Sequence, residues 1–312
     1  MTGPEQAAAP QLILEAEAKI AHLLGDPATE RFEASGVVLK DGTFYVIFDN
    51  TPHIAAVPKL APGADSRLIK PEGDHDAGYE DIAYDPATGR FFLLIEALPH
   101  HDGFLARIRE YDSAFSRSST DWLPFPFDRP NKGLEGLTCL SRADEMYLLA
   151  LCEGNRCQAG AEGRKPGGGR VQVFRKGRHQ WHHEASLHLP KTAWFEDYSS
   201  VAVAGDRIIV VSQSSAAVWL GTLDPSDWTV VDAGRIYRFP GDAEGGTLYG
   251  NVEGIAWLTP EQIVVVSDKA KPEQPPRCRA KDQSIHLFSI PPVPEAAGGA
   301  DTGVEAGWGP GR

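Results

Sequence analysis

The chain contains 312 residues, with 30 Lys and Arg against 43 Asp and Glu, and its formal net charge is −13. A surface that binds nucleic acid needs a basic face, so this charge argues against nucleic acid as a partner. The chain is 42% hydrophobic and 23% charged. These values are typical of a soluble globular protein and exclude disorder throughout the chain.

No stretch approaches the roughly 18 consecutive apolar residues of a membrane helix, and the first residues lack the charged-then-apolar pattern of a signal peptide. We therefore expect a cytoplasmic protein with no membrane partner. The cysteines are Cys139, Cys152, Cys157 and Cys278. Because they form no CxxC pair, they suggest neither a disulfide framework nor a structural zinc site. Pairing or metal binding by Cys152 and Cys157 is kept as an alternative.

The first predicted element, residues 12–24, is ambiguous. Leu12, Ala16 and Ile20 fit a helical stripe, whereas residues 12–20 also alternate as a strand does. From residue 35 onward, short segments rich in Val, Ile, Phe and Tyr are separated by turn signals such as residues 40–42 (Lys-Asp-Gly). This pattern is typical of many antiparallel strands without alternating helices.

These segments form a repeat. Each copy has a short phrase that begins with a polar residue, then a turn, then a very apolar strand that ends in an acidic or amide residue. The phrases begin at residues 35, 80, 135, 199 and 253, and the apolar strands cover residues 44–49, 91–96, 147–153, 208–213 and 263–268. Repeats of about 40 to 50 residues with four strands each indicate a propeller.

We predict an all-β fold, a β-propeller of five blades with four antiparallel strands each; six blades are the alternative. After residue 268 only residues 284–290 form a further strand pattern, so the fifth blade lacks one strand. Residues 12–20 are expected to complete it from the N-terminus. The domain would cover residues 11–290, with residues 1–10 and the tail 291–312 flexible.

The repeat brings polar residues to one rim of the propeller. The start of each inner strand and the end of the second strand should lie together there, because the two strands are antiparallel. The inner set is Ser35, Glu80, Glu135, Ser199 and Glu253, and the strand-end set is Asp49, Glu96, Glu153, Gln213 and Asp268. So many crowded carboxylates cannot all stay ionised without cations among them.

A divalent metal is the simplest counter-charge for this rim. An oxygen-only donor set suits Ca²⁺ or Mg²⁺, and Mn²⁺ becomes suitable if a histidine joins. The expected ligands are Glu80, Glu135, Glu253, Asp49 and Glu153. His53 and His100 follow the strand ends of adjacent repeats and are expected at the same rim. The structural alternative is that each carboxylate accepts backbone N–H bonds from a neighbouring blade.

Other residues are candidates for binding a substrate at this rim. Lys132 and Lys269 could supply positive charge, for an anionic substrate or simply to neutralise neighbouring carboxylates. Trp194 and Tyr198 precede the fourth inner strand and could form a pocket wall, or only pack between blades. No GxSxG motif is present, so the sequence does not indicate a serine hydrolase of that type.

Three phrases carry a family resemblance: residues 131–137 (Asn-Lys-Gly-Leu-Glu-Gly-Leu), 251–256 (Asn-Val-Glu-Gly-Ile-Ala) and 33–37 (Glu-Ala-Ser-Gly-Val). They resemble the blade-start motifs of the esterase-like or phytase-like and the SdiA-regulated propeller proteins. More remotely, they are similar to gluconolactonase-type propellers, in which an inner Glu-Gly glutamate ligates a divalent metal.

This resemblance implies a central metal held by Glu80, Glu135 and Glu253, with Asp49 and Asp268 as partners at the strand ends. The chain departs from the family pattern in showing five repeats where six are usual, and in lacking the export signal that many relatives carry.

The leading hypothesis is a divalent-metal-dependent hydrolase of a small ester, lactone or phosphoester. Glu96 or Asp268 would act as general base, and His53 and His100 as acid–base partners. The alternatives are a binding module without catalysis, which holds a ligand or protein at the rim, and a lyase or isomerase that uses the same metal. The sequence leaves the substrate and the oligomeric state open.

Overall fold

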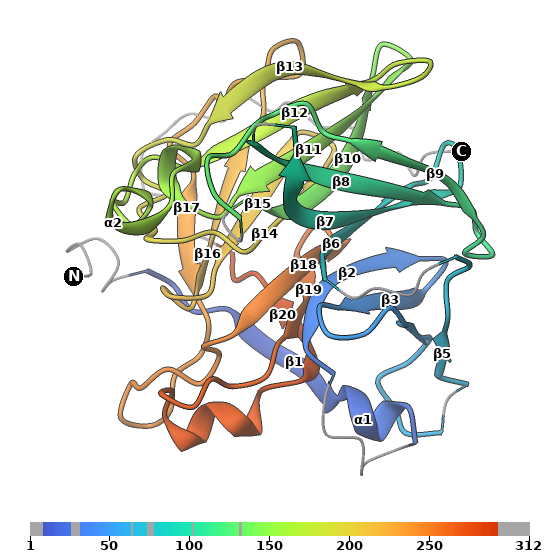
Figure 1. Cartoon of the computed structure of the whole chain (residues 1–312). Coiled ribbons are helices and arrows are strands. Elements are labelled where there is room, and N and C mark those ends of the chain that lie inside the picture. Colours follow the sequence, from blue (N-terminus) through green and yellow to red (C-terminus); the bar gives the residue numbers. More distant parts are fainter. Residues whose placement is uncertain are drawn as a thin grey trace.

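The computed structural model describes residues 9–25, 32–63, 65–73, 78–101, 103–130 and 133–292. The strands form five separate antiparallel sheets of four strands, and Figure 1 shows these sheets arranged around a common axis. The predicted propeller of five blades is therefore confirmed, and the six-bladed alternative is wrong. The predicted flexible ends fall mostly on residues 1–8 and 293–312, which lie outside the described residues.

The blades follow one another along the chain. Blade 1 consists of β2 (Ala34–Lys40), β3 (Thr43–Phe48), β4 (Ile54–Val57) and β5 (Arg67–Ile69). Blade 2 consists of β6 (Tyr79–Asp85), β7 (Arg90–His100), β8 (Gly103–Tyr111) and β9 (Arg117–Trp122). Blade 3 consists of β10 (Leu134–Arg142), β11 (Glu145–Cys152), β12 (Arg170–Lys176) and β13 (Trp181–His188). Blade 4 consists of β14 (Ser200–Ala204), β15 (Arg207–Ser212), β16 (Ala217–Thr222) and β17 (Arg235–Arg238). Blade 5 consists of β18 (Val252–Thr259), β19 (Gln262–Ser267), β20 (Ser284–Ser289) and β1 (Ile13–Lys19).

Short helical turns lie between the strands. They are α1 (Ile20–Leu23), η2 (Asn155–Cys157), α2 (Gly160–Gly163) and η3 (Pro276–Ala280).

The inner strands β2, β6, β10, β14 and β18 each contact the next around the axis, and β18 contacts β2, so the ring is closed. The second strand of each blade is packed on both faces by the neighbouring blades. In β19, for example, Ile263, Val264, Val265 and Val266 are all fully buried. A strand buried on both faces gives a continuous apolar run in the sequence. This is why the second strand was the clearest part of the repeat.

Strand β1 completes the last blade, as predicted. It pairs antiparallel with β20, from Ile13 opposite Ser289 to Lys19 opposite Ser284, and Figure 1 shows the blue β1 beside the orange β20. The helical alternative for residues 12–24 is right only for Ile20–Leu23, which form α1. The segment before β1 also binds blade 4, because Leu12 N donates to Arg238 O at 2.8 Å.

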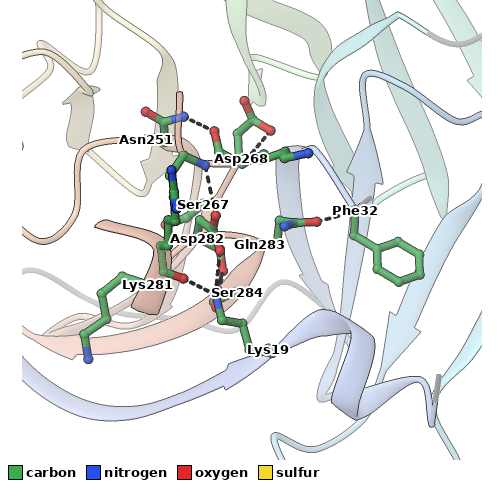
Figure 2. Close-up of polar contacts among 12 residues, drawn as sticks. Lys19, Phe32, Asn251, Ser267, Asp268, Lys281, Asp282, Gln283 and Ser284 are labelled. Carbon is green, nitrogen blue, oxygen red and sulfur yellow. Dashed lines mark hydrogen bonds and ion pairs between the residues drawn. The ribbon is translucent and has the colours of Figure 1, made fainter. Parts of the chain in front are cut away.

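Polar contacts fasten this closure and position the strand end after β19 (Figure 2). Lys19 Nζ donates to Asp282 Oδ1 at 2.6 Å. Phe32 N, at the entry to blade 1, donates to Gln283 Oε1 at 2.9 Å. Gln283 N in turn donates to the carbonyl of Asp268 at 3.3 Å. The chain ends of blades 1 and 5 are thereby joined at the rim where Asp268 lies.

A partly exposed acidic side chain, Glu17, reinforces the same joint through the buried His286. Glu17 on β1 bonds His286 Nδ1 on β20 at 3.1 Å and also pairs with Lys281. The hydrogen bond from His286 and the contact with Lys281 outweigh burial and hold the pKa of Glu17 at about 2. The folded ring therefore keeps this carboxylate ionised across the neutral range.

Equivalent positions of the five inner strands meet at the axis and plug the channel. They are Gly36, Asp81, Gly136, Ser200 and Gly254. Asp81 Oδ2 accepts hydrogen bonds from Leu137 N and Ser200 Oγ, both at 2.8 Å. A Cβ on Gly36 would lie 2.5 Å from Asp81 Oδ1, so glycine is required beside the aspartate. The Asp81–Ser200 plug thus occupies the space that the glycines leave.

Removing Asp81 is expected to destabilise the ring. Asp81→Ala leaves the buried N–H groups of Ile82 and Leu137 without their carboxylate acceptor, and each such loss costs about 1–3 kcal/mol. We expect the free energy of unfolding in urea to fall by about 3 kcal/mol. Asp112→Ala, which removes an acceptor from a hairpin turn, is the matched control. An Asp81→Ala loss no larger than that of the control would contradict the plug.

Candidate functional site

The inner strands carry serine in two blades and glutamate in the other three, just before the plug. Ser35 Oγ donates to Tyr79 O at 2.6 Å, and Ser199 Oγ donates to Val252 O at 2.8 Å. Each serine therefore bonds the backbone of the next blade, which is the structural role considered above. The other three positions hold Glu80, Glu135 and Glu253, here called the axial glutamates.

The axial glutamates lie close together in a poorly solvated environment. Burial and the nearby charge of Glu96 raise the pKa of Glu80 to about 8. Burial, followed by the charges of Glu80 and Glu153, raises the pKa of Glu135 well above its ordinary value. Glu80 and Glu135 also hydrogen-bond to each other. Because a bond between two carboxyl groups needs a proton, Glu135 holds one and donates it toward Glu80.

The third axial glutamate belongs to a group of acids from blades 1 and 5. Burial and the charge of Asp268 raise the pKa of Glu253 to about 8, against the opposing charge of Lys271. Burial raises the pKa of Asp268 to about 6. Burial, together with the charges of Asp268 and Glu33, raises the pKa of Asp49 to about 7. These carboxyl groups therefore change protonation near neutral pH.

The structure brings the predicted strand-end carboxylates close to the axial glutamates. The strand-end residues Asp49, Glu96, Glu153 and Asp268 all act on the pKa values of the axial glutamates. Glu33 was missed, although it lies two residues before Ser35. Lys271 was also missed. Its Nζ donates to the fourth strand-end residue, Gln213, at 3.3 Å.

A polar pocket of about 270 Å³ opens beside this group. It is lined by Glu153, Asp197, Ser214, Lys271 and by residues of the Gly-rich insert between β11 and β12. Asp197 Oδ2 accepts a hydrogen bond from Ser214 Oγ at 2.6 Å. Glu153 lines this pocket and also acts on the pKa of Glu135. The pocket therefore adjoins the axial glutamates and could admit a small polar substrate.

A disulfide holds the insert in place. Cys152 and Cys157 are bonded, so the expectation from cysteine spacing is wrong and the alternative pairing is right. The reason is local: η2 turns the chain back so that Cys157 lies against the end of β11. Disulfides persist in oxidising compartments and are rare in the reducing cytosol. This bond therefore favours an oxidising compartment. The cytoplasmic location expected from the sequence stays a prediction.

The buried Asn155 also anchors the insert. Its Nδ2 donates to Gly163 O at 2.9 Å and to Phe195 O at 3.0 Å, and its Oδ1 accepts from Gly168 N at 2.8 Å. These contacts join both ends of the insert to the entry of blade 4. The insert is therefore held in a fixed position as one wall of the polar pocket.

Removing the disulfide is expected to loosen this wall. Closing such a short loop stabilises the folded chain by about 2 kcal/mol in the chain-entropy account. The double variant Cys152→Ala with Cys157→Ala should therefore melt roughly 4 °C lower than the unaltered protein. Reductant should lower the melting temperature of the unaltered protein by a similar amount and leave the variant unchanged. Equal melting temperatures with and without reductant in the unaltered protein would contradict the bond.

The predicted substrate-binding residues lie in several places. Tyr198 is buried, and its hydroxyl donates to Ala193 O at 3.0 Å, so it packs the entry to blade 4. Trp194 is 42% exposed and lies over Gly167 of the insert, outside the pocket lining. The nearby lysine at the rim is Lys271, two residues beyond the predicted Lys269. Lys132 lies outside the described residues.

The predicted histidines each contact a residue of their own blade. The His53 ring bonds Thr51 Oγ1 at 2.8 Å. His100 follows a bulge in β7 and contacts Trp122 on the outermost strand β9, with ring centroids 4.7 Å apart. The expectation that His100 shares the central rim is therefore wrong. The irregular register of β7 between Ile95 and Leu98 separates His100 from the strand end at Glu96.

The donor set fits a hard cation by its chemistry. The side chains with the largest effects on the pKa values of the axial glutamates and Asp268 are carboxylates and Lys271. In the described ranges, no three His, Cys, Asp or Glu side chains are already spaced to hold a metal ion. Mg²⁺ is commonly bound through one or two carboxylates with waters completing its shell. A hydrogen-bonded pair such as Glu80 and Glu135 meets that requirement once its proton is lost.

Comparisons with known proteins add no functional assignment. No protein-family model matches the chain, and no curated protein matches it. Among solved structures, glutaminyl cyclase of Myxococcus xanthus is 13% identical, with 90% of this chain and 97% of that chain covered and a TM-score of 0.48. A GH43_1 enzyme of Xanthomonas citri is 12% identical, with 87% of this chain and 89% of that chain covered and a TM-score of 0.46.

A protein provisionally assigned as a gluconolactonase is 11% identical, with 82% of this chain and 73% of that chain covered and a TM-score of 0.43. At these identities and TM-scores the likenesses carry no conclusion about activity, and the fold rests on the strand pairing described above.

None of the helices in the described ranges has the length and apolar character needed to span a bilayer.

Proposed function

We propose that the axial glutamates bind Mg²⁺ or Ca²⁺ and that the protein hydrolyses a small ester, lactone or phosphoester at the rim. The observation that carries this proposal is the hydrogen-bonded pair of Glu80 and Glu135, from different blades, inside a group of acids with raised pKa values. Clusters of titratable groups with perturbed pKa values are characteristic of catalytic sites. A divalent cation would replace the shared proton.

In this proposal each acid has a distinct role. Glu80 and Glu135 hold the cation, with Glu253, Asp49 and Glu153 as further donors. The cation, when bound, supplies polarisation of the scissile carbonyl or phosphoryl oxygen. Asp268, whose pKa is about 6, is largely ionised at neutral pH and takes the proton of the attacking water. Glu96 is the alternative base. The polar pocket beside Glu153 receives the substrate, and Lys271 favours an anionic group there.

A binding module without catalysis is the second candidate. The contacts of Ser35 and Ser199 favour it in part, since two of the five rim positions are used only to join blades. In that case the axial glutamates would hold protons, or a structural ion, with no turnover. A screen of lactones, aryl esters and phosphoesters with added Mg²⁺ or Ca²⁺ separates the two candidates.

The pH dependence of stability tests the cation. Glu80 and Glu253 have raised pKa values when folded, so the folded chain holds more protons than the unfolded chain between about pH 4.5 and 8. Without metal, stability should be greatest in acid and fall as the pH rises through 8. A cation present at 100 times its Kd adds about 2.7 kcal/mol, or roughly 5 °C at this chain length.

The measurement is thermal unfolding between pH 4.5 and 8.5, in EDTA and in millimolar MgCl₂ or CaCl₂. We expect the curves to coincide in acid and to separate above neutral pH. Identical curves at pH 8 with EDTA and with both cations would rule out the metal site and leave the protonated, structural cluster.

A further inference from the structure

A second concavity, separate from the rim site, opens at the opposite face of the propeller. It has a volume of about 510 Å³ and is lined by the later halves of all five inner strands. Because those strands begin at the carboxylate rim, their later halves lie at the other mouth of the channel. This space is here called the apolar funnel, and its wall includes Leu39, Tyr84, Leu140, Val203 and Trp257.

The floor of the funnel is closed. Five aliphatic residues at equivalent positions, Val37, Ile82, Leu137, Val201 and Ile255, are each at most 2% exposed. The Asp81–Ser200 plug lies directly behind them, one residue earlier in each inner strand. A molecule in the funnel therefore has no path to the axial glutamates, and the two sites are independent.

The wall of the funnel offers almost no charge to a ligand. Asp85 is the only charged residue among the lining residues of the described chain. Its carboxylate is already used: Oδ1 accepts from Ala87 N at 3.1 Å and Oδ2 accepts from Thr88 Oγ1 at 2.6 Å. The thiol of Cys139 donates to Tyr84 O at 2.8 Å. No lining side chain is a cation, so an anionic ligand would lose its hydration here without gaining an ion-pair partner from the wall itself.

Two aromatic side chains in the wall are held from behind. The ring of Tyr84 packs on Phe91 with centroids 4.8 Å apart. The guanidinium of Arg207 lies 4.5 Å from the ring of Trp257. Fixed aromatic rings give a large contact area at low entropic cost, and they favour flat or ring-shaped ligands.

We propose that the apolar funnel binds one neutral, ring-containing apolar small molecule. Its volume lies within the range of about 300–1,000 Å³ found for small-molecule sites. Its recessed shape, closed floor and apolar wall suit a small molecule better than the surface of another folded protein. Binding removes the exposed apolar wall from water, which is the driving force. This proposal does not depend on the chemistry at the rim.

One other occupant is available within the chain itself. The described chain ends at Pro292, shortly after Ser289, which pairs with Gln262 where β19 begins. That end of blade 5 is on the funnel side, so the described chain ends on the funnel side of the propeller. A variant that stops at Pro292 is therefore included in the test.

The test uses two fluorescent probes that differ in one charge. The full chain is titrated with neutral N-phenyl-1-naphthylamine and with its sulfonated analogue 1-anilinonaphthalene-8-sulfonate. We expect saturable binding of one neutral probe with a micromolar Kd, and at least about tenfold weaker binding of the sulfonate, since the wall gives the charge no partner. Glu135→Gln and added Mg²⁺ should leave this binding unchanged, which separates it from the rim site.

Two variants test whether the probe binds in the apolar funnel. Ala204 lines the funnel and is partly exposed, so Ala204→Trp should fill the space and weaken probe binding at least tenfold. Ala114→Trp, on an exposed hairpin outside the funnel, is the matched control. Trp257→Phe should reduce energy transfer from tryptophan to the bound probe and does not depend on the folding of the first variant.

No saturable binding by the full chain would overturn the proposal. So would equal binding by Ala204→Trp and the control, with energy transfer unchanged in Trp257→Phe. Binding that occurs only in the chain ending at Pro292 would identify residues 293–312 as the occupant and would equally overturn the small-molecule assignment.

Discussion

Glu135→Gln is expected to lower turnover on any substrate found in the screen by about 10³-fold. The amide can still donate a hydrogen bond to Glu80, as the protonated carboxyl group does, so the local structure should be kept. What the amide cannot do is lose a proton and bind a cation as a carboxylate. The variant therefore separates a structural role of Glu135 from a ligand role. The measurement is kcat with saturating MgCl₂, together with the melting temperature.

The matched control is Glu184→Gln, which changes a carboxylate paired with Arg175 on the outer strand of blade 3. Its activity and melting temperature should stay within error of the unaltered protein, because exposed ion pairs contribute little. Glu135→Gln should melt no lower than the control above neutral pH, since it removes a group that resists ionisation. Full activity in Glu135→Gln would place the chemistry elsewhere or leave the protein a binding module.

Deleting residues 1–24 is expected to abolish the fold. The deletion removes β1 and its ladder with β20, and with them the buried Leu12, Ile20 and Leu23. Burial of each such side chain contributes about 1.5–3 kcal/mol. The total reaches the 5–15 kcal/mol that most native proteins possess. The buried His286 would also lose its hydrogen-bond partner Glu17.

Circular dichroism, urea unfolding and size-exclusion chromatography of the deletion variant should show a chain that is largely unfolded or aggregated. Deletion of residues 1–8, which lie before the described chain, is the control and should leave the melting temperature unchanged. A synthetic peptide of residues 9–25, added in excess, should restore part of the native signal by filling the empty edge of blade 5. A deletion variant as stable as the full chain would contradict closure by β1.

The repeat could be recognised from the sequence because each blade is packed on both faces. Its second strand must be apolar at every position, as in residues 263–266 of β19, and a polar residue must follow where that strand reaches the rim. These are local consequences of burial. They were sufficient to predict five blades, closure by residues 12–20, and the carboxylates around the axis.

Only the tertiary structure decided how those polar groups are used. Ser35 and Glu80 occupy equivalent positions in the repeat, yet the serine bonds a backbone carbonyl of the next blade and the glutamate bonds the Glu135 side chain of the next blade. Asp81 stands where three other blades have glycine, and it therefore plugs the channel. His100 was separated from the strand end at Glu96 by the irregular register of β7, and Cys157 was brought to Cys152 by a turn. Pairings of this kind join residues from different blades or depend on one irregular backbone step, and a sequence pattern of fixed spacing records neither.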